Sequence, residues 1–334
     1  MKDYQEYSLL RHNTFRIDSK CRRFLEYESI EEAVSTAEVL RSSKLPFLIV
    51  GGGSNLLLTK DFDGVVVHCG IKGIDGSCSP IVKVGAGEVF DDVVEYCVEH
   101  QLYGAENLSL IPGEVGASAV QNIGAYGSEA KDIIEKIYAV EIATGNRVEI
   151  SNADCCYGYR NSRFKSEWRN KYLITHVSYL MSAFFSPKLD YGNIRTELGR
   201  KGIAEPSPRE LRQTIIEIRR EKLPDPEITG NAGSFFMNPV VGRDKYEQLS
   251  EQYPDMPHYY IDDSHEKIPA GWMIEQCGWK GRSLGPAGVH DRQALVLVNR
   301  GGAKGEDIVR LSDAIRHDVK AKFGIDIFPE VNII

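Results

Sequence analysis

The stretch IPGEVGASAVQNIGAYG, residues 111–127, is the part of this sequence that decides the fold. Glycine recurs in it at Gly113, Gly116, Gly124 and Gly127, and Glu114 is its only charged residue. Because glycine has no Cβ and the other residues are mostly small or apolar, the backbone can lie directly against a flat, bulky ligand. The stretch therefore predicts a glycine-rich loop that cradles a large cofactor.

A second glycine cluster, Gly51-Gly52-Gly53-Ser54-Asn55, follows the apolar run FLIV, which predicts a buried strand over residues 47–50. Backbone N–H groups in such a turn can bind a pyrophosphate. A Rossmann fingerprint is not present, because Leu56 stands where a glycine is needed, and there is no Walker A motif. A tight turn explains either cluster alone, whereas the two together favour one shared ligand.

The composition is that of a globular protein with two or three domains: 334 residues, of which 42% are hydrophobic. The net charge of −8 argues against nucleic acid or an anionic membrane as the main partner. Seven scattered cysteines without a Cys-x-x-Cys pair predict a reduced, cytoplasmic protein. No apolar run approaches the ~20 residues of a spanning helix, and the histidines lack ligand spacing, so we expect no metal.

Hydrophobic periodicity predicts an order of strands and helices. A βαββ unit is expected from a strand at 24–27, a helix that Ser29 and Glu32 open with capping-box spacing, and strands at 47–50 and 65–68. Strands are then predicted at 81–84 and 172–181, a hairpin from 137–142 and 147–150, and helices at 90–100 and 208–223. Helices at 243–252, 270–277 and 305–323, a strand at 294–298 and a strand-like end at 325–334 predict a final α+β region.

Three side chains outside the glycine clusters are candidates for chemistry. Arg160, in the basic stretch YGYRNSRFK, can hold a carboxylate through two parallel hydrogen bonds, although a solvated basic loop is the alternative. Ser234 lies between a glycine and two phenylalanines without a Gly-x-Ser-x-Gly elbow, which disfavours a hydrolase nucleophile and leaves a turn serine as the alternative. Glu330 has apolar neighbours, and it is either a half-buried acid with a raised pKa or an outward strand residue.

Taken together, these motifs resemble the UDP-N-acetylenolpyruvoylglucosamine reductase family of flavoenzymes. They occur in order over nearly the whole chain, and an ordered series is far more specific than any one glycine motif. The matching stretches are GGGSNL at 51–56, residues 111–113 and 121–127, YRNSRFK at 159–165, KLPDP at 222–226, GNAGSFF at 230–236, AGW at 270–272 and PEV at 329–331. Met237 departs from the family pattern, in which a lysine is frequent at this position.

The resemblance implies an α+β, three-domain FAD-binding fold of the PCMH/vanillyl-alcohol-oxidase type with a C-terminal substrate-binding α+β domain. Residues 1–70, joined by the C-terminal strand 325–334, would form the first part of the FAD-binding domain and residues 71–222 its second part. Residues 223–324 would form the substrate-binding domain. Tyr191 in the stretch LDYGN resembles the subtype with a mobile tyrosine loop over the active site.

The implied activity is the NADPH-dependent reduction of the enolpyruvyl group of UDP-N-acetylglucosamine enolpyruvate to the lactyl ether. The product is UDP-N-acetylmuramate, a precursor of peptidoglycan and hence of cell wall biogenesis, cell shape and cell division. FAD would be bound non-covalently, with NADPH as co-substrate and a UDP-sugar as substrate. No obligate protein partner is evident, and the sequence leaves the oligomeric state open.

The resemblance also implies site residues. In the catalytic group, hydride passes from flavin N5 to C3 of the substrate, Ser234 gives a proton to C2, and Arg160 and Glu330 stabilise the intermediate. The implied cofactor-binding residues are Gly51, Gly52, Gly53, Ser54, Asn55, Ile111, Pro112, Gly113, Ala117, Ser118, Asn122, Gly124, Ala125 and Tyr126. The implied substrate-binding residues are Tyr159, Tyr191, Lys222, Asn238 and Gln293.

Two other functions are compatible with the same residues. One is another PCMH-type FAD oxidase or dehydrogenase of a small hydroxylated substrate, an enzyme class that often ties its flavin covalently. The other is a non-catalytic module that binds a sugar nucleotide or a flavin, in which Ser234 and Glu330 are structural. Release of the flavin by mild denaturation argues against the first, and NADPH oxidation that depends on the enolpyruvyl nucleotide excludes the second.

Overall fold

The computed structural model describes all 334 residues of the chain. The residues fall into two compact units. The first unit consists of Met1–Tyr7, Cys21–Gly52 and Phe62–Glu221, and the second of Ser8–Lys20, Gly53–Asp61 and Lys222–Ile334. The division into three domains stays a prediction from the sequence.

The first unit contains a four-stranded sheet in the order β1-β2-β5-β3, in which β2 and β3 run parallel to β5. Its strands are β1 (Lys2–Ser8), β2 (Lys20–Tyr27), β3 (Phe47–Val50) and β5 (Phe62–Cys69). Helix α1 (Ile30–Ser42) follows β2, and the Ser29 side chain caps it by accepting the N–H of Glu32 at 3.1 Å. The βαββ unit is confirmed, but the Glu32 carboxylate accepts the N–H of Glu28 rather than that of Ser29.

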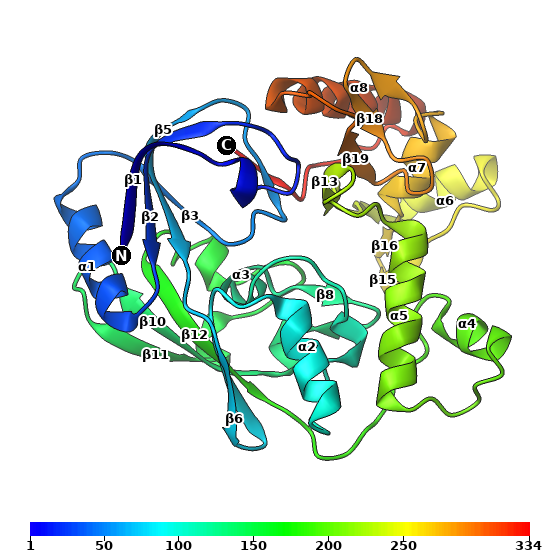
Figure 1. Cartoon of the computed structure of the whole chain (residues 1–334). Coiled ribbons are helices and arrows are strands. Elements are labelled where there is room, and N and C mark those ends of the chain that lie inside the picture. Colours follow the sequence, from blue (N-terminus) through cyan, green and yellow to red (C-terminus); the bar gives the residue numbers. More distant parts are fainter. The chain divides into compact units, whose positions relative to one another are not determined.

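A five-stranded sheet completes the first unit in the order β11-β10-β12-β7-β6, and every neighbouring pair in it is antiparallel. Its strands are β6 (Ile74–Cys78), β7 (Ile81–Gly85), β10 (Ile134–Glu141), β11 (Arg147–Ser151) and β12 (Tyr172–Leu180). The predicted hairpin is confirmed, with Gly145 at φ +78° in its turn. The buried Tyr27 hydroxyl of β2 donates to the Ile174 carbonyl of β12 at 2.7 Å, so the two sheets share one core (Figure 1).

The glycines of segment 111–127 predicted a loop, but only part of the segment is a loop. Helix α3 (Val115–Gln121) occupies its middle and packs against β12, and the short strands β8 (Gly124–Ala125) and β9 (Ser128–Glu129) follow it. Gly116 is needed for protein packing, because its N–H donates to the Ala86 carbonyl at 2.8 Å and an added Cβ would lie 3.0 Å from the Ala86 Cβ. Ala117 and Ala119 favour a helix, and burial of Val115 and Ala119 stabilises its two turns.

Three further helices belong to the first unit: α2 (Phe90–Glu99), α4 (Ile194–Arg200) and α5 (Pro208–Lys222). The predicted helices 90–100 and 208–223 are thus confirmed to within one residue. The buried Arg212 of α5 donates to the Asp91 carboxylate of α2 at 2.6 Å. A small apolar core joins α4 to α5 through Ile194, Leu198, Leu211, Ile215 and Ile218.

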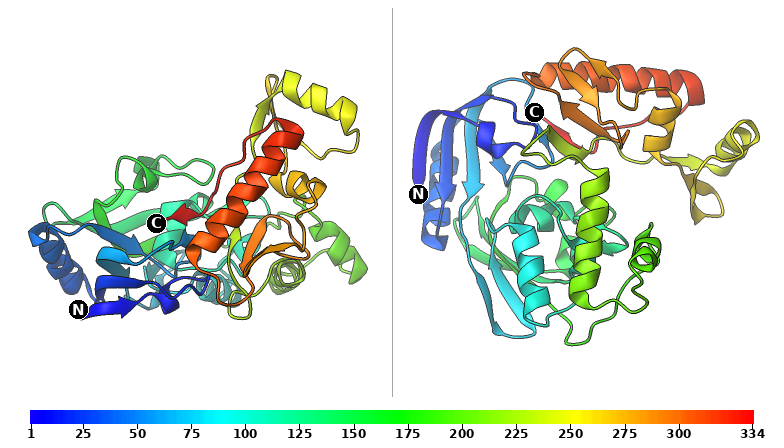
Figure 2. Two further views of the ribbon diagram at one scale, coloured as in Figure 1. Left: turned by 90° about the horizontal axis from the view of Figure 1, so that it is seen from above. Right: turned by 45° about the vertical axis from the view of Figure 1, so that its right-hand side comes forward.

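The second unit is built on a four-stranded antiparallel sheet in the order β13-β19-β18-β17. The strands are β13 (Gly230–Ser234), β17 (Ser283–Leu284), β18 (Ala287–Val289) and β19 (Val296–Asn299). The long helix α8 (Gly305–Phe323) packs against this sheet, and α7 (Ala270–Gln276) packs against α8 (Figures 1 and 2). Both helices were predicted from the sequence.

A smaller sheet of β14 (Val240–Gly242), β16 (His265–Lys267) and β15 (Tyr259–Asp262) lies beside α6 (Arg243–Gln252), which was also predicted. At the end of the chain, β20 (Asn332–Ile333) pairs in parallel with β4 (Leu56–Leu57). The strand predicted over 325–334 is therefore broken into two pieces with different partners. Residues 328–330 pair with 235–237 through an isolated bridge at Pro329, and only Asn332–Ile333 pairs with β4. The strand predicted at 294–298 begins two residues later, because the N–H of Val296 closes a turn onto Gln293.

Candidate active site

The two predicted cofactor-binding glycine clusters lie side by side in the first unit. Strand β3 ends at Val50, and an added Cβ on the following Gly51 would lie 3.0 Å from the Ala117 Cβ. An added Cβ on Gly52 would lie 3.6 Å from the Gly113 Cα. The joint use of both clusters by one ligand is therefore geometrically possible, and side chains at these glycines would separate them.

The rest of the first cluster belongs to the second unit. Gly53 has φ +66°, and an added Cβ would collide with the His12 carbonyl, so glycine is required there. The Asn55 carbonyl accepts both the backbone N–H of Asn332 at 3.1 Å and its side-chain amide at 3.0 Å. The turn after β3 is thus anchored to the C-terminal strand β20.

A buried histidine between two carboxylates supports the glycine cluster. His68 of β5 faces Glu26 of β2 through Nδ1 at 2.8 Å and Glu114 through Nε2 at 3.0 Å. Burial lowers the pKa of His68, but the hydrogen bonds to Glu114 and Glu26 outweigh it and the pKa is raised overall. A carboxylate at each ring nitrogen favours the protonated ring, in which both nitrogens are donors.

Glu114 connects this cluster to the cofactor-binding glycines. Glu114 directly precedes α3, and its Oε2 would lie 3.3 Å from a Cβ added to Gly51. Sequence reasoning missed Glu26 and His68 as its partners. Glu114 alone could have indicated this cluster, since a single charged residue in a stretch of small and apolar residues needs a partner when it is buried.

Asn122 and Arg160 fix the second half of segment 111–127. Asn122 adopts a left-handed φ of 48°, its Nδ2 donates to the Gly158 carbonyl at 2.8 Å, and its Oδ1 accepts the N–H of Lys131 at 3.0 Å. Arg160, with φ 52°, donates from Nη2 to the Gly124 carbonyl at 2.9 Å. The guanidinium predicted to be catalytic therefore lies against the segment predicted to bind the flavin.

The beginning of the segment is held by two partly buried charged side chains, Asp91 and Arg219. Leu110, which precedes Ile111 and Pro112, has a left-handed φ of 57° and donates its N–H to the Asp91 carboxylate at 2.5 Å. Its carbonyl accepts Nε of Arg219 at 3.2 Å. Helices α2 and α5 therefore set the path of the chain into the glycines.

The other predicted cofactor and substrate residues of the first unit differ in accessibility. The Ser118 hydroxyl is buried and donates to the Val115 carbonyl at 2.6 Å, so the prediction for Ser118 rests on its backbone. Burial raises the pKa of Tyr126, and its ring meets the Tyr191 ring edge-on at 6.4 Å. Tyr159 and Tyr191 are 59% and 53% exposed, which leaves their rings accessible to a ligand.

Ser234 and Glu330 lie on neighbouring segments of the second unit. Ser234 ends β13 after a register shift, where Gly233 takes φ +68°. The N–H of Glu330 donates to the carbonyl of Phe235, the residue after Ser234, at 2.8 Å. Ser234, the predicted proton donor, and Glu330, the predicted acid, therefore lie on backbone segments that are hydrogen-bonded to each other.

Asn238 and Gln293, predicted to bind the substrate, both lie at the beginning of α7. The Asn238 Oδ1 accepts the N–H of Ala270 at 2.9 Å. The Gln293 Oε1 accepts the N–H of Leu295 at 3.3 Å and would lie 3.3 Å from a Cβ added to Gly271. These contacts use the amide oxygens and leave the two NH₂ groups as donors for an anion. Lys222 is the last residue of α5.

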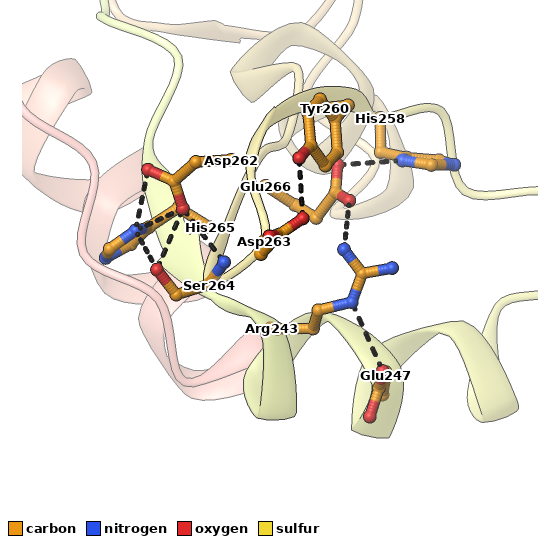
Figure 3. Close-up of polar contacts among 9 residues, drawn as sticks. All are labelled: Arg243, Glu247, His258, Tyr260, Asp262, Asp263, Ser264, His265 and Glu266. Atoms are coloured by element: carbon orange, nitrogen blue, oxygen red, sulfur yellow. Dashed lines mark hydrogen bonds and ion pairs between the residues drawn. The ribbon is translucent and has the colours of Figure 1, made fainter.

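A second polar cluster in this unit resembles a catalytic triad without its geometry (Figure 3). The Asp262 carboxylate and the Ser264 hydroxyl lie 2.9 Å and 3.1 Å from His265. Both contact the same nitrogen, Nδ1, whereas a triad needs its acid and its nucleophile on opposite nitrogens. These side chains therefore belong to the turn of the hairpin between β15 and β16. No group of three or more His, Cys, Asp or Glu side chains in the structure could hold a metal ion.

Comparisons with known proteins show which proteins the chain is similar to. Residues 22–151 match the FAD binding domain family, and residues 225–334 match the C-terminal domain of UDP-N-acetylenolpyruvoylglucosamine reductase. The crystal structure of UDP-N-acetylenolpyruvylglucosamine reductase from Thermus caldophilus superposes with a TM-score of 0.68 at 20% identity, over 99% of this chain and 98% of that one. None of the helices is long and apolar enough to cross a membrane.

The chain thus has the FAD-binding fold of a flavin-dependent oxidoreductase with a C-terminal α+β domain, as predicted. It is 54% identical to UDP-N-acetylenolpyruvoylglucosamine reductase of Bacteroides fragilis over 99% of both chains. It is 43% identical to the enzyme of the same name from Burkholderia multivorans over 97% of this chain and 95% of that one. The chain belongs to the UDP-N-acetylenolpyruvoylglucosamine reductase family.

Proposed function

We propose that this chain is an NADPH-dependent flavoenzyme of peptidoglycan precursor synthesis. It reduces the enolpyruvyl group of UDP-N-acetylglucosamine enolpyruvate to the lactyl ether and gives UDP-N-acetylmuramate. The observation that carries this proposal is the 54% identity to a curated reductase over 99% of both chains. We further propose that it works in the cytoplasm without an obligate protein partner, in keeping with its seven free cysteines.

The residues of the first unit fit a non-covalent FAD. The close approach of Gly52 to Gly113 and of Gly51 to Ala117 provides the bare backbone that a pyrophosphate and a flat ring require. When it is bound, FAD supplies the hydride chemistry, taking two electrons from NADPH and passing them to C3 of the enolpyruvyl group. The remaining steps belong to side chains of the chain itself.

Ser234 is the proton donor to C2 in this proposal. Hydride addition at C3 leaves negative charge on C2, which spreads into the neighbouring carboxylate. A serine hydroxyl is a weak acid, but a carbanion is a much stronger base, and a nearby cation stabilises the alkoxide that forms. The left-handed Gly233 turns Ser234 out of the β13 ladder, and Ser234 is exposed on the surface of its unit.

Arg160 and Glu330 hold the developing charge. Arg160 supplies a permanent positive charge and two parallel donors that match a carboxylate. A protonated Glu330 adds one short hydrogen bond to the same oxygens. Because Nη2 of Arg160 is tied to the Gly124 carbonyl at 2.9 Å, the guanidinium is oriented before the substrate arrives.

The UDP-sugar is held mainly through its diphosphate. Lys222 supplies a positive charge, Asn238 and Gln293 supply amide donors beside α7, and Tyr159 and Tyr191 supply exposed hydroxyls. One lysine with several neutral donors is enough for an anion site in a chain whose net charge is −8.

Anaerobic incubation of the purified protein with NADPH and the enolpyruvyl nucleotide tests the assignment. We expect NADPH oxidation that depends on the nucleotide, and a product nucleotide that is heavier by two hydrogen atoms. NADPH oxidation that proceeds equally without the nucleotide would contradict the assignment. Flavin that stays with the denatured chain would contradict non-covalent binding.

A further inference from the structure

Asn107 joins two segments that are far apart in the sequence. It lies in the 3₁₀ helix η2 (Glu106–Leu108) and is only 3% exposed. Its Nδ2 donates to the Tyr126 carbonyl at 2.7 Å and to the Lys188 carbonyl at 2.9 Å. Of the two ends of the amide, only the NH₂ group can donate to carbonyls, so these two partners fix the orientation of the amide.

The two carbonyls belong to segments that meet again at their rings. Tyr126 lies in the glycine-rich segment 111–127, and Lys188 stands three residues before Tyr191. The Tyr126 and Tyr191 rings meet edge-on at 6.4 Å, and a Cβ added to Gly127 would lie 3.5 Å from the Tyr191 Cβ. Asn107 therefore links the backbones of the two segments whose tyrosine rings are in contact.

Residues 188–190 also make apolar and exposed contacts. Leu189 is buried in the small core with α4 and α5. The ion pairs Lys188–Asp132 at 3.3 Å and Asp190–Arg195 at 2.6 Å are solvent-exposed, and exposed pairs of this kind add little. The hydrogen bonds from Asn107 come from a buried side chain, so they hold the stretch more firmly than these exposed ion pairs do.

We propose that Asn107 is a positioning residue for the substrate, which holds the stretch carrying Tyr191 against segment 111–127. Its two hydrogen bonds fix the base of this stretch at Lys188, from which Tyr191 reaches the nucleotide, so less binding energy is spent on ordering the chain. The proposal rests on the proposed function in one respect, the contact of Tyr191 with the substrate. The tie itself does not depend on the identity of the ligand.

Limited trypsin digestion of the FAD-loaded enzyme tests the tie directly. Asn107→Leu keeps the approximate size of the side chain and removes both donors, so cleavage after the exposed Lys188 should be ~10-fold faster than in the wild type. Asn152→Leu is the matched control. The Asn152 amide also donates to two carbonyls, those of Lys131 at 2.8 Å and Ile134 at 2.7 Å. Equal cleavage in the wild type and Asn107→Leu would overturn the proposal.

Asn107→Ser guards against a Leu variant that fails to fold. Serine keeps one donor hydrogen, so its cleavage rate at Lys188 should lie between those of the wild type and Asn107→Leu. If only the serine variant is folded, a rate several-fold above the wild type supports the proposal, and a wild-type rate contradicts it.

The effect on the substrate separates positioning from a general structural role. In Asn107→Leu the KM for the enolpyruvyl nucleotide should rise ~10-fold, while reduction of the flavin by NADPH keeps its rate. The double variant Asn107→Leu, Tyr191→Ala should have the same KM as Tyr191→Ala alone, because Asn107 acts through Tyr191. Additive effects would contradict the proposal. A wild type that does not turn over the nucleotide would refute the proposed function, and the trypsin result would still decide the role of Asn107.

Discussion

Ser234 shows how much of the chemistry can depend on one side chain. Its hydroxyl follows a left-handed glycine, and its neighbour Phe235 accepts the N–H of Glu330 at 2.8 Å. These contacts position the backbone on both sides of the serine. The proposed proton transfer then depends only on the hydroxyl.

Replacing Ser234 with alanine should affect only one half of the reaction. A positioned acid contributes ~10²–10⁴ in rate, so reoxidation of the flavin by the enolpyruvyl nucleotide should slow at least about a hundredfold. Reduction of the flavin by NADPH should stay near the wild-type rate. Stopped-flow absorbance measures each half, and Ser264→Ala, an exposed turn serine of the same unit, is the control. Equal slowing of both halves would remove Ser234 from the role of proton donor.

Arg160 is predicted to act through the shape of its guanidinium as well as its charge. Arg160→Lys keeps the charge but loses the planar pair of donors, so flavin reoxidation should slow by about 10²-fold. The half-buried Arg163 of the same stretch, changed to lysine, serves as the control. Near-wild-type turnover of Arg160→Lys would refute this role.

Arg160, Ser234 and Glu330 could be proposed as catalytic residues from the sequence, because each stands in a short motif that resembles the family. Asn107 and His68 could not. Their side chains act on carbonyls and carboxylates that tertiary structure alone brings near. Nothing in the residues that flank Asn107 indicates that its amide reaches Tyr126 and Lys188.

At the scale of elements, β2, β5 and α3 meet at the charged cluster of Glu26, His68 and Glu114. Burial raises the pKa of Glu26, but the hydrogen bonds from Lys2 and His68 outweigh it and lower the pKa overall. The pKa of His68 is raised above its ordinary value of 6.5. The cluster therefore stabilises the fold when His68 is charged and Glu26 is ionised.

The sign of the pH dependence follows from these two shifts. The raised pKa of His68 contributes stability that is fully present below pH 6.5 and is lost as the pH rises through the folded-state pKa. The lowered pKa of Glu26 contributes stability that is present above its ordinary value of 4.5 and is lost as the pH falls through the folded-state pKa. The cluster is therefore most stabilising between about pH 4.5 and pH 6.5.

His68→Gln removes the charge that this window requires. At pH 6 the variant should be less stable than the wild type by about 3 kcal/mol, because two carboxylates lose a buried partner. The difference should shrink as the pH rises towards 9. Thermal unfolding from pH 6 to pH 9 measures it, with the exposed His317→Gln as control. A gap that is constant with pH would contradict a charged His68.

Most elements could be predicted from the sequence because their periodicity agreed with their tertiary environment. The helix α3 was missed because its sequence, VGASAVQ, has weak helix propensity and is stabilised by burial of Val115 and Ala119. The last strand was predicted as one piece, whereas residues 328–330 and Asn332–Ile333 pair with different partners. In both places a local signal competed with packing, and packing decided the structure.

At the scale of the whole molecule, the seven cysteines are all free, and their burial separates them into classes. Cys78 and Cys156 are exposed, whereas burial raises the pKa of Cys97 and of Cys69 to about 12. A thiolate is the reactive species, so these buried thiols are inert in the folded chain.

Alkylation with iodoacetamide at pH 8 should therefore modify Cys78 and Cys156 rapidly and the five other cysteines only slowly or after unfolding. Mass spectrometry of the intact protein and its peptides gives the order. The same reaction in denaturant, where all seven should be modified, is the control. Rapid alkylation of Cys97 in the native protein would contradict the core described here.

The fold of the whole molecule could be predicted because its motifs occur in family order along the chain. The interleaving of the two units could not. Ser8–Lys20 and Gly53–Asp61 join Lys222–Ile334 in the second unit through contacts that no local pattern indicates. The assignment of these two N-terminal segments to the second unit therefore comes from tertiary structure alone.

The central claim is that a flavin bound to this chain carries electrons from NADPH to an enolpyruvyl sugar nucleotide. The most direct test follows the flavin absorbance of the purified, yellow protein without oxygen. We predict that NADPH bleaches it and that colour returns only when UDP-N-acetylglucosamine enolpyruvate is added, one equivalent for each flavin. Bleached protein that stays colourless after this addition would contradict the claim.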